Sequence, residues 1–292
     1  MIYMLRPLAL VCCATLVSAP AAAHTMWINL APDHAEQQVV TSVAYGDYLP
    51  GSELLRTEWG AMRLATYELL SPAGVRADLV PPDVGAARAR ELPGGARITA
   101  GGDTGQRKVS LADGARGTYL VLGQSPAFRY VHYRGKDGND HYSDGPESSI
   151  ADLSEVLDVS HEVFFLKSAF AAGGWTETAP AKQLFEIVPL TDLHAVRPGD
   201  IVRLRVLLRG KPWRAAHGAS LLTAQNQALG DRWGLASPLA SGVAEFRLPT
   251  AGLWRFDARH DAEAAQFPEL VRGAKPGEEL TINSSFTVHV RP

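Results

Sequence analysis

A histidine at the predicted start of the exported chain carries the clearest potential for chemistry in this sequence. Residues 1–23 are typical of a signal peptide, because Arg6 precedes an apolar run over positions 8–17 and alanines fill positions 21–23. Cleavage after Ala23 would make His24 the first residue, with a free α-amine beside its imidazole. Nitrogen donors of this kind suit nickel, cobalt and copper, so we expect His24 to be a bidentate metal ligand. The alternative is a frayed and solvated terminus.

Further metal-ligand types occur later in the chain. His132 and His141 lie in a polar, glycine-rich stretch that also holds several carboxylates, although its spacing does not fit an EF-hand loop. A solvated turn is the alternative for this stretch. His260 ends a strand-like run beside Asp257 and Asp261 and is another candidate ligand. A purely structural role is the alternative for His260.

The composition narrows the class of protein. The 292 residues carry 28 basic and 31 acidic side chains, a formal charge of −3, which excludes a strongly basic nucleic-acid binder. The 2 cysteines, Cys12 and Cys13, would leave with the signal peptide, so a metal site in the exported chain must use nitrogen and oxygen ligands. The sequence contains no nucleophile elbow, zinc-binding helix motif or phosphate loop. We therefore do not expect an enzyme.

Short strands must position these residues. Apolar and β-branched runs recur between Gly and Pro turns, which is typical of an all-β sandwich or barrel. We expect two β-sandwich domains of immunoglobulin or transthyretin-like type, at residues 24–124 and 183–292. In the second domain, positions 201–206 alternate between one polar-leaning face and one apolar face, as expected of a strand with one buried side.

The middle of the chain differs from both predicted domains. We expect residues 125–182 to form a connecting segment. Within it, the polar stretch 133–149 indicates an exposed loop, residues 150–157 a short helix, and residues 161–171 a buried strand.

Five short motifs in order resemble one known family. The start HTMWINLAP at 24–32 is similar to the Ala-His-x-x-Trp-Leu-x-Pro opening of a family of exported bacterial proteins. That family is catalogued as a domain of unknown function and is also described as the periplasmic component of ABC-type cobalt/nickel uptake systems. The other similar motifs are FLKSA at 165–169, LFEIVPLTD at 184–192, PGD through VLLRGKP at 198–212, and AGLW at 251–254.

The resemblance implies two β-sandwich-like domains, the handling of nickel or cobalt, and a metal-uptake membrane transporter as partner. Of the ligands, His24 carries over from the family. The family often has Gly-His after its first strand, whereas here Gly46 is followed by Asp47. Aspartate can donate oxygen to a metal, so Asp47 joins the candidates.

We therefore expect an exported, periplasmic protein that binds a divalent transition metal, nickel or cobalt before copper, and assists an uptake system. The candidate ligands are His24, Asp47, His132, His141 and His260. One alternative is a metal-free envelope module, structural or ligand-binding, with a face of exposed tryptophans: Trp59, Trp175, Trp213 or Trp233. Another is a copper protein with a histidine brace, which requires a second histidine close to His24.

Overall fold

The computed structural model describes residues 24–32, 37–57, 60–85, 88–91, 96–215, 220–230 and 234–292. The predicted signal peptide lies outside these ranges. Within them the regular structure is strand, apart from three short 3-10 turns. The expected all-β fold is confirmed. The turns are η1 (Glu147–Ser149), η2 (Gln227–Leu229) and η3 (Ala264–Gln266).

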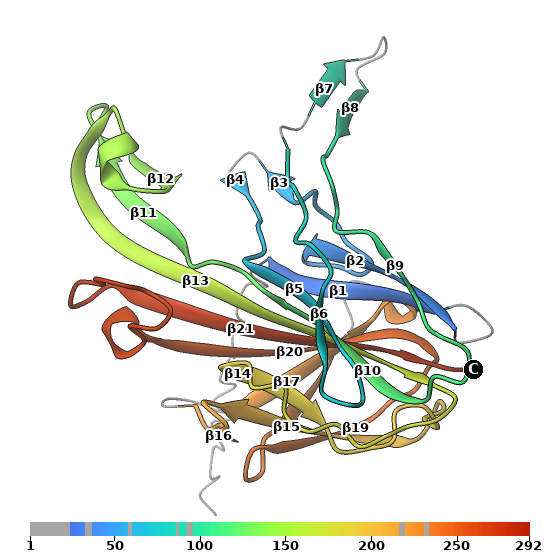
Figure 1. The fold of residues 1–292 in the computed structure, drawn as a ribbon. Coiled ribbons are helices and arrows are strands. Elements are labelled where there is room, and N and C mark those ends of the chain that lie inside the picture. Colours follow the sequence, from blue (N-terminus) through green and yellow to red (C-terminus); the bar gives the residue numbers. More distant parts are fainter. Residues whose placement is uncertain are drawn as a thin grey trace, which may run out of the picture.

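One large sheet runs through the molecule (Figure 1). Its neighbouring strands are antiparallel, except that β13 and β21 run parallel. β11 (Phe128–Gly135) pairs with the first half of β13 and with β12 (Asp140–Asp144), and together they form a projecting arm. The strand order is β18 (Gly234–Pro238), β17 (Leu221–Asn226), β20 (Gly252–Glu263), β21 (Glu279–Val290), β13 (Leu153–Ala172), β10 (Gly117–Gln124), β5 (Thr66–Leu70), β6 (Arg76–Asp78).

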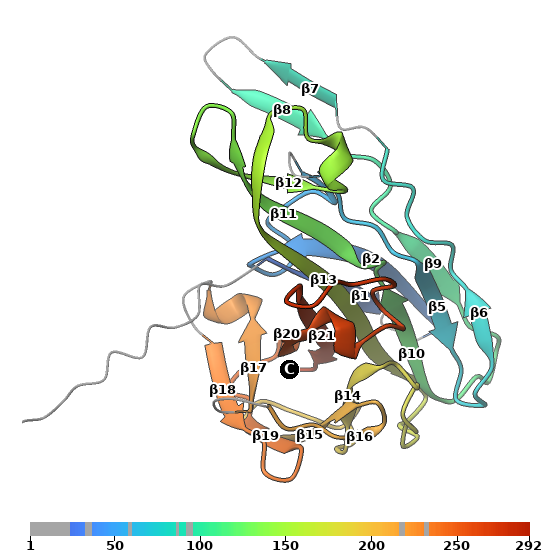
Figure 2. The ribbon, with the colours of Figure 1, turned by 90° about the vertical axis from the view of Figure 1, so that its left-hand side faces the viewer.

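Smaller sheets lie on either side of the large one (Figures 1 and 2). The N-terminal sheet contains β1 (Thr25–Pro32), β2 (Gln38–Gly46) and β9 (Arg107–Ser110). The C-terminal sheet contains β14 (Phe185–Pro189), β15 (Ile201–Leu208), β16 (Lys211–Pro212) and β19 (Val243–Arg247). Two short ribbons complete the strands: β3 (Arg56–Thr57) with β4 (Gly60–Ala61), and β7 (Arg88–Glu91) with β8 (Arg97–Ala100).

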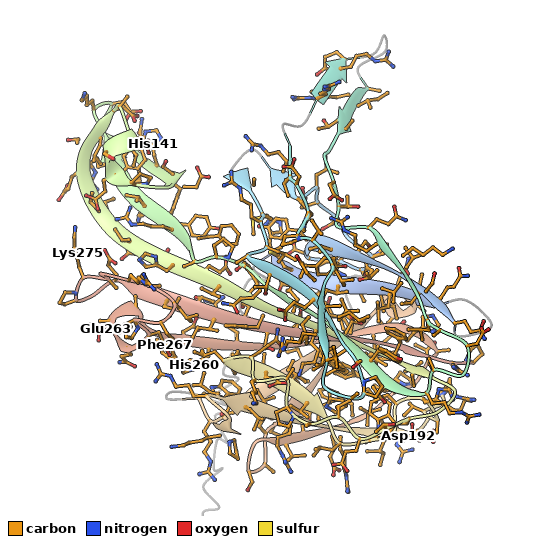
Figure 3. All side chains as sticks on the ribbon, viewed as in Figure 1. His141, Asp192, His260, Glu263, Phe267 and Lys275 are labelled. Carbon is orange, nitrogen blue, oxygen red and sulfur yellow. The ribbon has the colours of Figure 1, made fainter. Side chains whose placement is uncertain are left out.

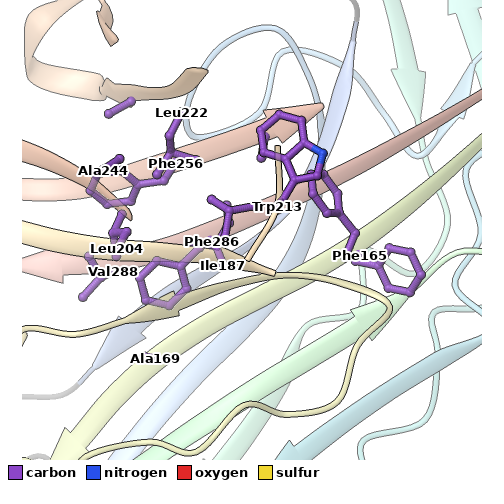
Figure 4. Close-up of a cluster of buried hydrophobic side chains, with 14 of the residues drawn as sticks. Phe165, Ala169, Ile187, Leu204, Trp213, Leu222, Ala244, Phe256, Phe286 and Val288 are labelled. Atoms are coloured by element: carbon purple, nitrogen blue, oxygen red, sulfur yellow. The ribbon is translucent and has the colours of Figure 1, made fainter. Parts of the chain in front are cut away.

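Side chains of the central strands point alternately to the two faces of the large sheet, and a hydrophobic core lies on each face. On β13, Phe164 and Leu166 pack into the N-terminal core, whereas Val163 and Phe165 pack into the C-terminal core. Figure 4 shows the C-terminal core, where side chains of the large sheet meet those of β14, β15 and β19. Because β13 is buried on both faces, its second half reads as a nearly continuous apolar run.

The middle segment is more regular than its sequence suggested. The stretch expected to be a loop, 133–149, contains the end of β11, all of β12 and the turn η1. The expected helix at 150–157 is wrong, because β13 already begins at Leu153 and pairs with β11 there. The expected strand at 161–171 is the second half of β13. The large sheet thus takes strands from residues 24–124, 125–182 and 183–292 alike.

Candidate functional site

His24 and Asp47 lie side by side at one end of the N-terminal sheet. His24 directly precedes β1 and Asp47 directly follows β2, and the antiparallel register pairs Thr25 with Gly46. The two side chains therefore leave neighbouring strand ends, and His24 Nε2 lies 3.5 Å from Asp47 Oδ2. The structure brings together these two of the five candidate ligands.

The pair combines access to solvent with a buried oxygen that has no partner. The His24 side chain is 45% exposed, and its ring centroid lies 5.3 Å from that of Tyr45. The Asp47 backbone N–H donates to Ser52 Oγ over 3.1 Å. Asp47 Oδ1 is buried and has no hydrogen-bond partner among the described residues. A buried polar atom in this condition indicates a place where a further group can bind.

Polar side chains of the large sheet lie beside the pair. Trp254 and Phe256 of β20 point into the C-terminal core, so Arg255 and Asp257 point to the opposite face, toward β1. Ser285 of β21 is the register partner of Asp257. Arg255 Nη1, Asp257 Oδ1 and Ser285 Oγ are also buried without a partner in the part of the chain that the structure describes.

Glu162 of β13 adds a carboxylate to the same side of the sheet. Burial raises the pKa of Glu162 to about 7, although the hydrogen bond that Asn283 Nδ2 donates over 2.8 Å favours its charged form. Burial, Glu162 and Asp47 raise the pKa of Tyr45 to about 12, so that its phenol stays neutral. Burial and Glu162 also raise the pKa of Tyr130. The charged groups that act on Tyr45, whose ring packs against that of His24, are the carboxyls of Glu162, Asp47 and Glu53, and these favour a cation over an anion.

Replacing Glu162 by glutamine is expected to change how stability depends on pH. Because the folded-state pKa of about 7 lies above the ordinary value of 4.5, the folded protein binds this proton more tightly. This contribution to stability is complete below about pH 4.5 and is lost as the pH rises through about 7. The Glu162→Gln protein should match wild type at low pH and exceed it at pH 8, by up to about 3 kcal/mol. Urea unfolding at both pH values measures the difference, and parallel pH profiles would contradict it.

The histidines of the arm lie apart from each other. The register of β11 and β12 pairs His132 with Tyr142 and Tyr133 with His141, so the two histidines point to opposite faces of the hairpin. His132 stacks on Tyr142 with ring centroids 4.4 Å apart. His141 Nε2 lies 3.1 Å from Asp137 Oδ1. Side chains on opposite faces of one hairpin do not share a metal ion.

His260 belongs to the C-terminal core. Its Nδ1 accepts a hydrogen bond of 3.2 Å from Trp213 Nε1, and Phe267 packs edge-on against its ring. Burial lowers the pKa of His260. Figure 3 shows His260 beside Phe267 and well away from His141 on the arm. It lies on the opposite face of β20 from Arg255, so the sheet itself separates it from the His24 pair.

Within the described residues, no group of three or more His, Cys, Asp or Glu side chains is arranged to hold a metal ion. The site around His24 therefore consists of one imidazole, one neighbouring carboxylate and the polar floor beside them. Sequence reasoning missed Glu162, Arg255 and Ser285. The alternation of polar residues at 255, 257 and 259 is a signal of a polar sheet face, but it does not tell which segment lies over that face.

A family profile described as a domain of unknown function (DUF4198) matches residues 21–262. The chain belongs to this family. The DUF4198 match begins just before His24 and ends within β20, so it contains every candidate ligand and also Arg255. No curated protein shows a significant match to the chain.

Membership in DUF4198 confirms the resemblance to a family of unknown function. The role in nickel or cobalt uptake stays a prediction. Among the residues that the structure describes, no helix has the length and apolar character needed to cross a membrane.

Proposed function

We propose that this protein binds a divalent transition metal at His24, with nickel or cobalt favoured and copper possible, and delivers it to an uptake system. The observation that carries the proposal is the separation of 3.5 Å between His24 Nε2 and Asp47 Oδ2. Metal-binding histidines commonly direct their second ring nitrogen at a carboxylate, which fixes the tautomer and the orientation of the ring.

The two ring nitrogens of His24 have different roles in this proposal. Cleavage after Ala23 frees the α-amine, and Nδ1 is the ring nitrogen that closes an unstrained chelate with the amine of its own residue. Nε2 then faces away from the metal and toward Asp47, as it does here. In this proposal Asp47 is the group that orients His24, rather than a ligand itself.

The surroundings favour a cation that arrives from solution and leaves again. Glu162, Asp47 and Asp144 are close enough to Tyr45 or Tyr130 to raise the pKa of these phenols. Such acidic groups attract a divalent ion toward the terminus. The exposed half of His24 leaves the ion accessible to a partner. With the predicted signal peptide and the family resemblance, this supports a periplasmic protein that hands the metal to a membrane transporter.

Adding one alanine before His24 tests the proposal directly. The extension converts the α-amine into an amide and removes one donor of the chelate. We expect Ni²⁺ and Co²⁺ to bind the mature protein at least about 100-fold more tightly than the extended protein. Isothermal titration calorimetry measures both affinities, and mass spectrometry of the exported protein checks that His24 is its first residue. Equal affinities would overturn the proposal.

The alternatives receive less support from the described residues. Trp213 is only 3% exposed and Trp175 packs against the C-terminal core, so neither forms the exposed aromatic face of a ligand-binding module. Trp59 and Trp233 lie outside the described residues. A copper brace needs a second histidine with His24, and in the described ranges none joins His24 and Asp47. His34 and His217 lie outside those ranges.

A further inference from the structure

We infer that Arg255 is the positioning residue of the N-terminal site, because one guanidinium holds both chain segments that bear His24 and Asp47. This inference rests on the proposed function. It assigns a role in metal binding to a side chain of the large sheet that itself contacts neither the metal nor the His24 ring.

The first segment is held through its tryptophan. β1 lies along β13 and β21. Successive side chains of a strand point to opposite sides, so Met26 packs in the N-terminal core while Trp27 lies on the other side of β1. The guanidinium carbon of Arg255 lies 4.3 Å from the centroid of the Trp27 ring. A cation stacked on a buried indole is held there electrostatically and by packing. Trp27 is fully buried, so this contact fixes the start of β1 and with it the direction in which His24 leaves the strand.

The second segment is held through its backbone. Arg255 Nη2 donates to the carbonyl oxygen of Asp47 over 3.2 Å, across 208 positions of sequence. This bond fixes the peptide from which the Asp47 side chain projects toward His24. The position of the carboxylate relative to the imidazole therefore depends on where the guanidinium lies.

The guanidinium is itself fixed by two further groups. Its Nε donates to Asp257 Oδ2 and its Nη2 to Gln225 Oε1, each over 2.7 Å. Arg255 is 3% exposed. A planar guanidinium can stack on a ring and donate in several fixed directions at once, which the single ammonium of lysine cannot do. The arrangement therefore needs arginine and not merely a positive charge.

Arg259 provides a matched control in the same strand. It lies four residues further along β20, on the same face, and its Nε likewise donates to the aspartate two residues on, Asp261 Oδ1, over 2.8 Å. Its ion pair is about half exposed, and among the interactions of the described residues it contacts neither Trp27 nor Asp47. Arg259→Lys therefore makes the same chemical change without touching the two segments of the site.

The experiment combines Arg255→Lys with the N-terminal alanine extension. Ni²⁺ affinity is measured by calorimetry for four proteins: the mature and extended forms of wild type and of Arg255→Lys. We expect Arg255→Lys to weaken binding about tenfold or more in the mature form, as for other groups that orient a metal-binding histidine. In the extended form, which has lost the chelate, we expect no further loss. A general loss of stability would act on both forms alike.

The outcomes separate the two proposals. If mature Arg255→Lys binds Ni²⁺ as tightly as wild type while the extension still weakens binding, the positioning role is wrong and the metal site stands. If the extension has no effect on wild type, the proposed function fails and the positioning role fails with it. Arg259→Lys should bind like wild type, and an equal loss in this control would also overturn the positioning role. If Arg255→Lys does not fold, Asp257→Asn takes its place under the same criteria, because it loosens the guanidinium without removing it.

Discussion

Methionine in place of Lys167 is expected to lower the free energy of unfolding by about 4 kcal/mol. Lys167 of β13 and Glu186 of β14 form an ion pair whose side chains are 2% and 1% exposed. Lys167 Nζ also donates to the Ile187 carbonyl oxygen over 2.8 Å, and burial lowers the pKa of this lysine. Methionine fills a similar volume but leaves the Glu186 carboxylate in the interior without its counter-charge. Urea unfolding followed by tryptophan fluorescence measures the change.

Two further variants test whether this loss of stability comes from the uncompensated Glu186 carboxylate. The double variant Lys167→Met/Glu186→Leu should recover most of the stability, because two apolar side chains can replace a buried pair at little cost. Arg203→Met breaks an ion pair with Glu245 whose side chains are 61% and 52% exposed, and it should cost at most about 1 kcal/mol. If the double variant is no more stable than Lys167→Met, the explanation by a buried charge is wrong.

Alanine in place of Trp27 should have an effect of similar size, about 4 kcal/mol. The indole is fully buried between the start of β1 and the Arg255 guanidinium, and its Nε1 donates to Asn29 Oδ1 over 2.9 Å. Truncation leaves a cavity and removes the surface on which the guanidinium stacks. Chemical denaturation with circular dichroism as the signal measures the loss.

Phenylalanine at position 27 is the matched comparison for this prediction. Trp27→Phe keeps an aromatic face under Arg255 and loses the hydrogen bond to Asn29. Its loss of unfolding free energy should therefore be less than half of the loss in Trp27→Ala. Trp175 packs only partly buried against the C-terminal core, and Trp175→Ala should cost clearly less than Trp27→Ala. Equal losses for alanine and phenylalanine at position 27 would mean that the aromatic face contributes nothing.

Local patterns in the sequence predicted many of the strands but not how they assemble. In β15, Val202, Leu204 and Val206 are buried while Ile201 and the arginines between them are exposed, as the alternation predicts. Alternation of apolar and polar residues predicts that a strand has one buried face, but it does not predict which strands are its neighbours. The expected helix at 150–157 failed for the same reason, because the pairing of β13 with β11 overrides the local preference.

The sequence pointed to two residues of the candidate site, His24 and Asp47, but not to the residues that hold them. The signal-peptide pattern and the motif at residues 24–32 drew attention to His24. Asp47 was found through a departure from the family pattern, and its place beside His24 follows from the register of β1 and β2. Nothing local to Arg255 indicates that it contacts Trp27 and Asp47, since those contacts depend on β1 lying along the large sheet. Contacts between residues so far apart in the sequence can be identified only once the fold is known.

The parallel pairing of β13 with β21 has a consequence for how the protein folds. The ladder joins Ser160 to Glu279 and continues to Ala169 and Val288, so the whole C-terminal sheet lies between the two strands in sequence. Closing so long a loop is slow, and long-range β pairing sets the pace of folding. Arg255 lies on the strand next to β21, so the contacts that hold the start of β1 also depend on this long-range assembly. A chain cut short before β20 would retain His24 and Asp47 in its sequence, yet it would lack the guanidinium that holds them together.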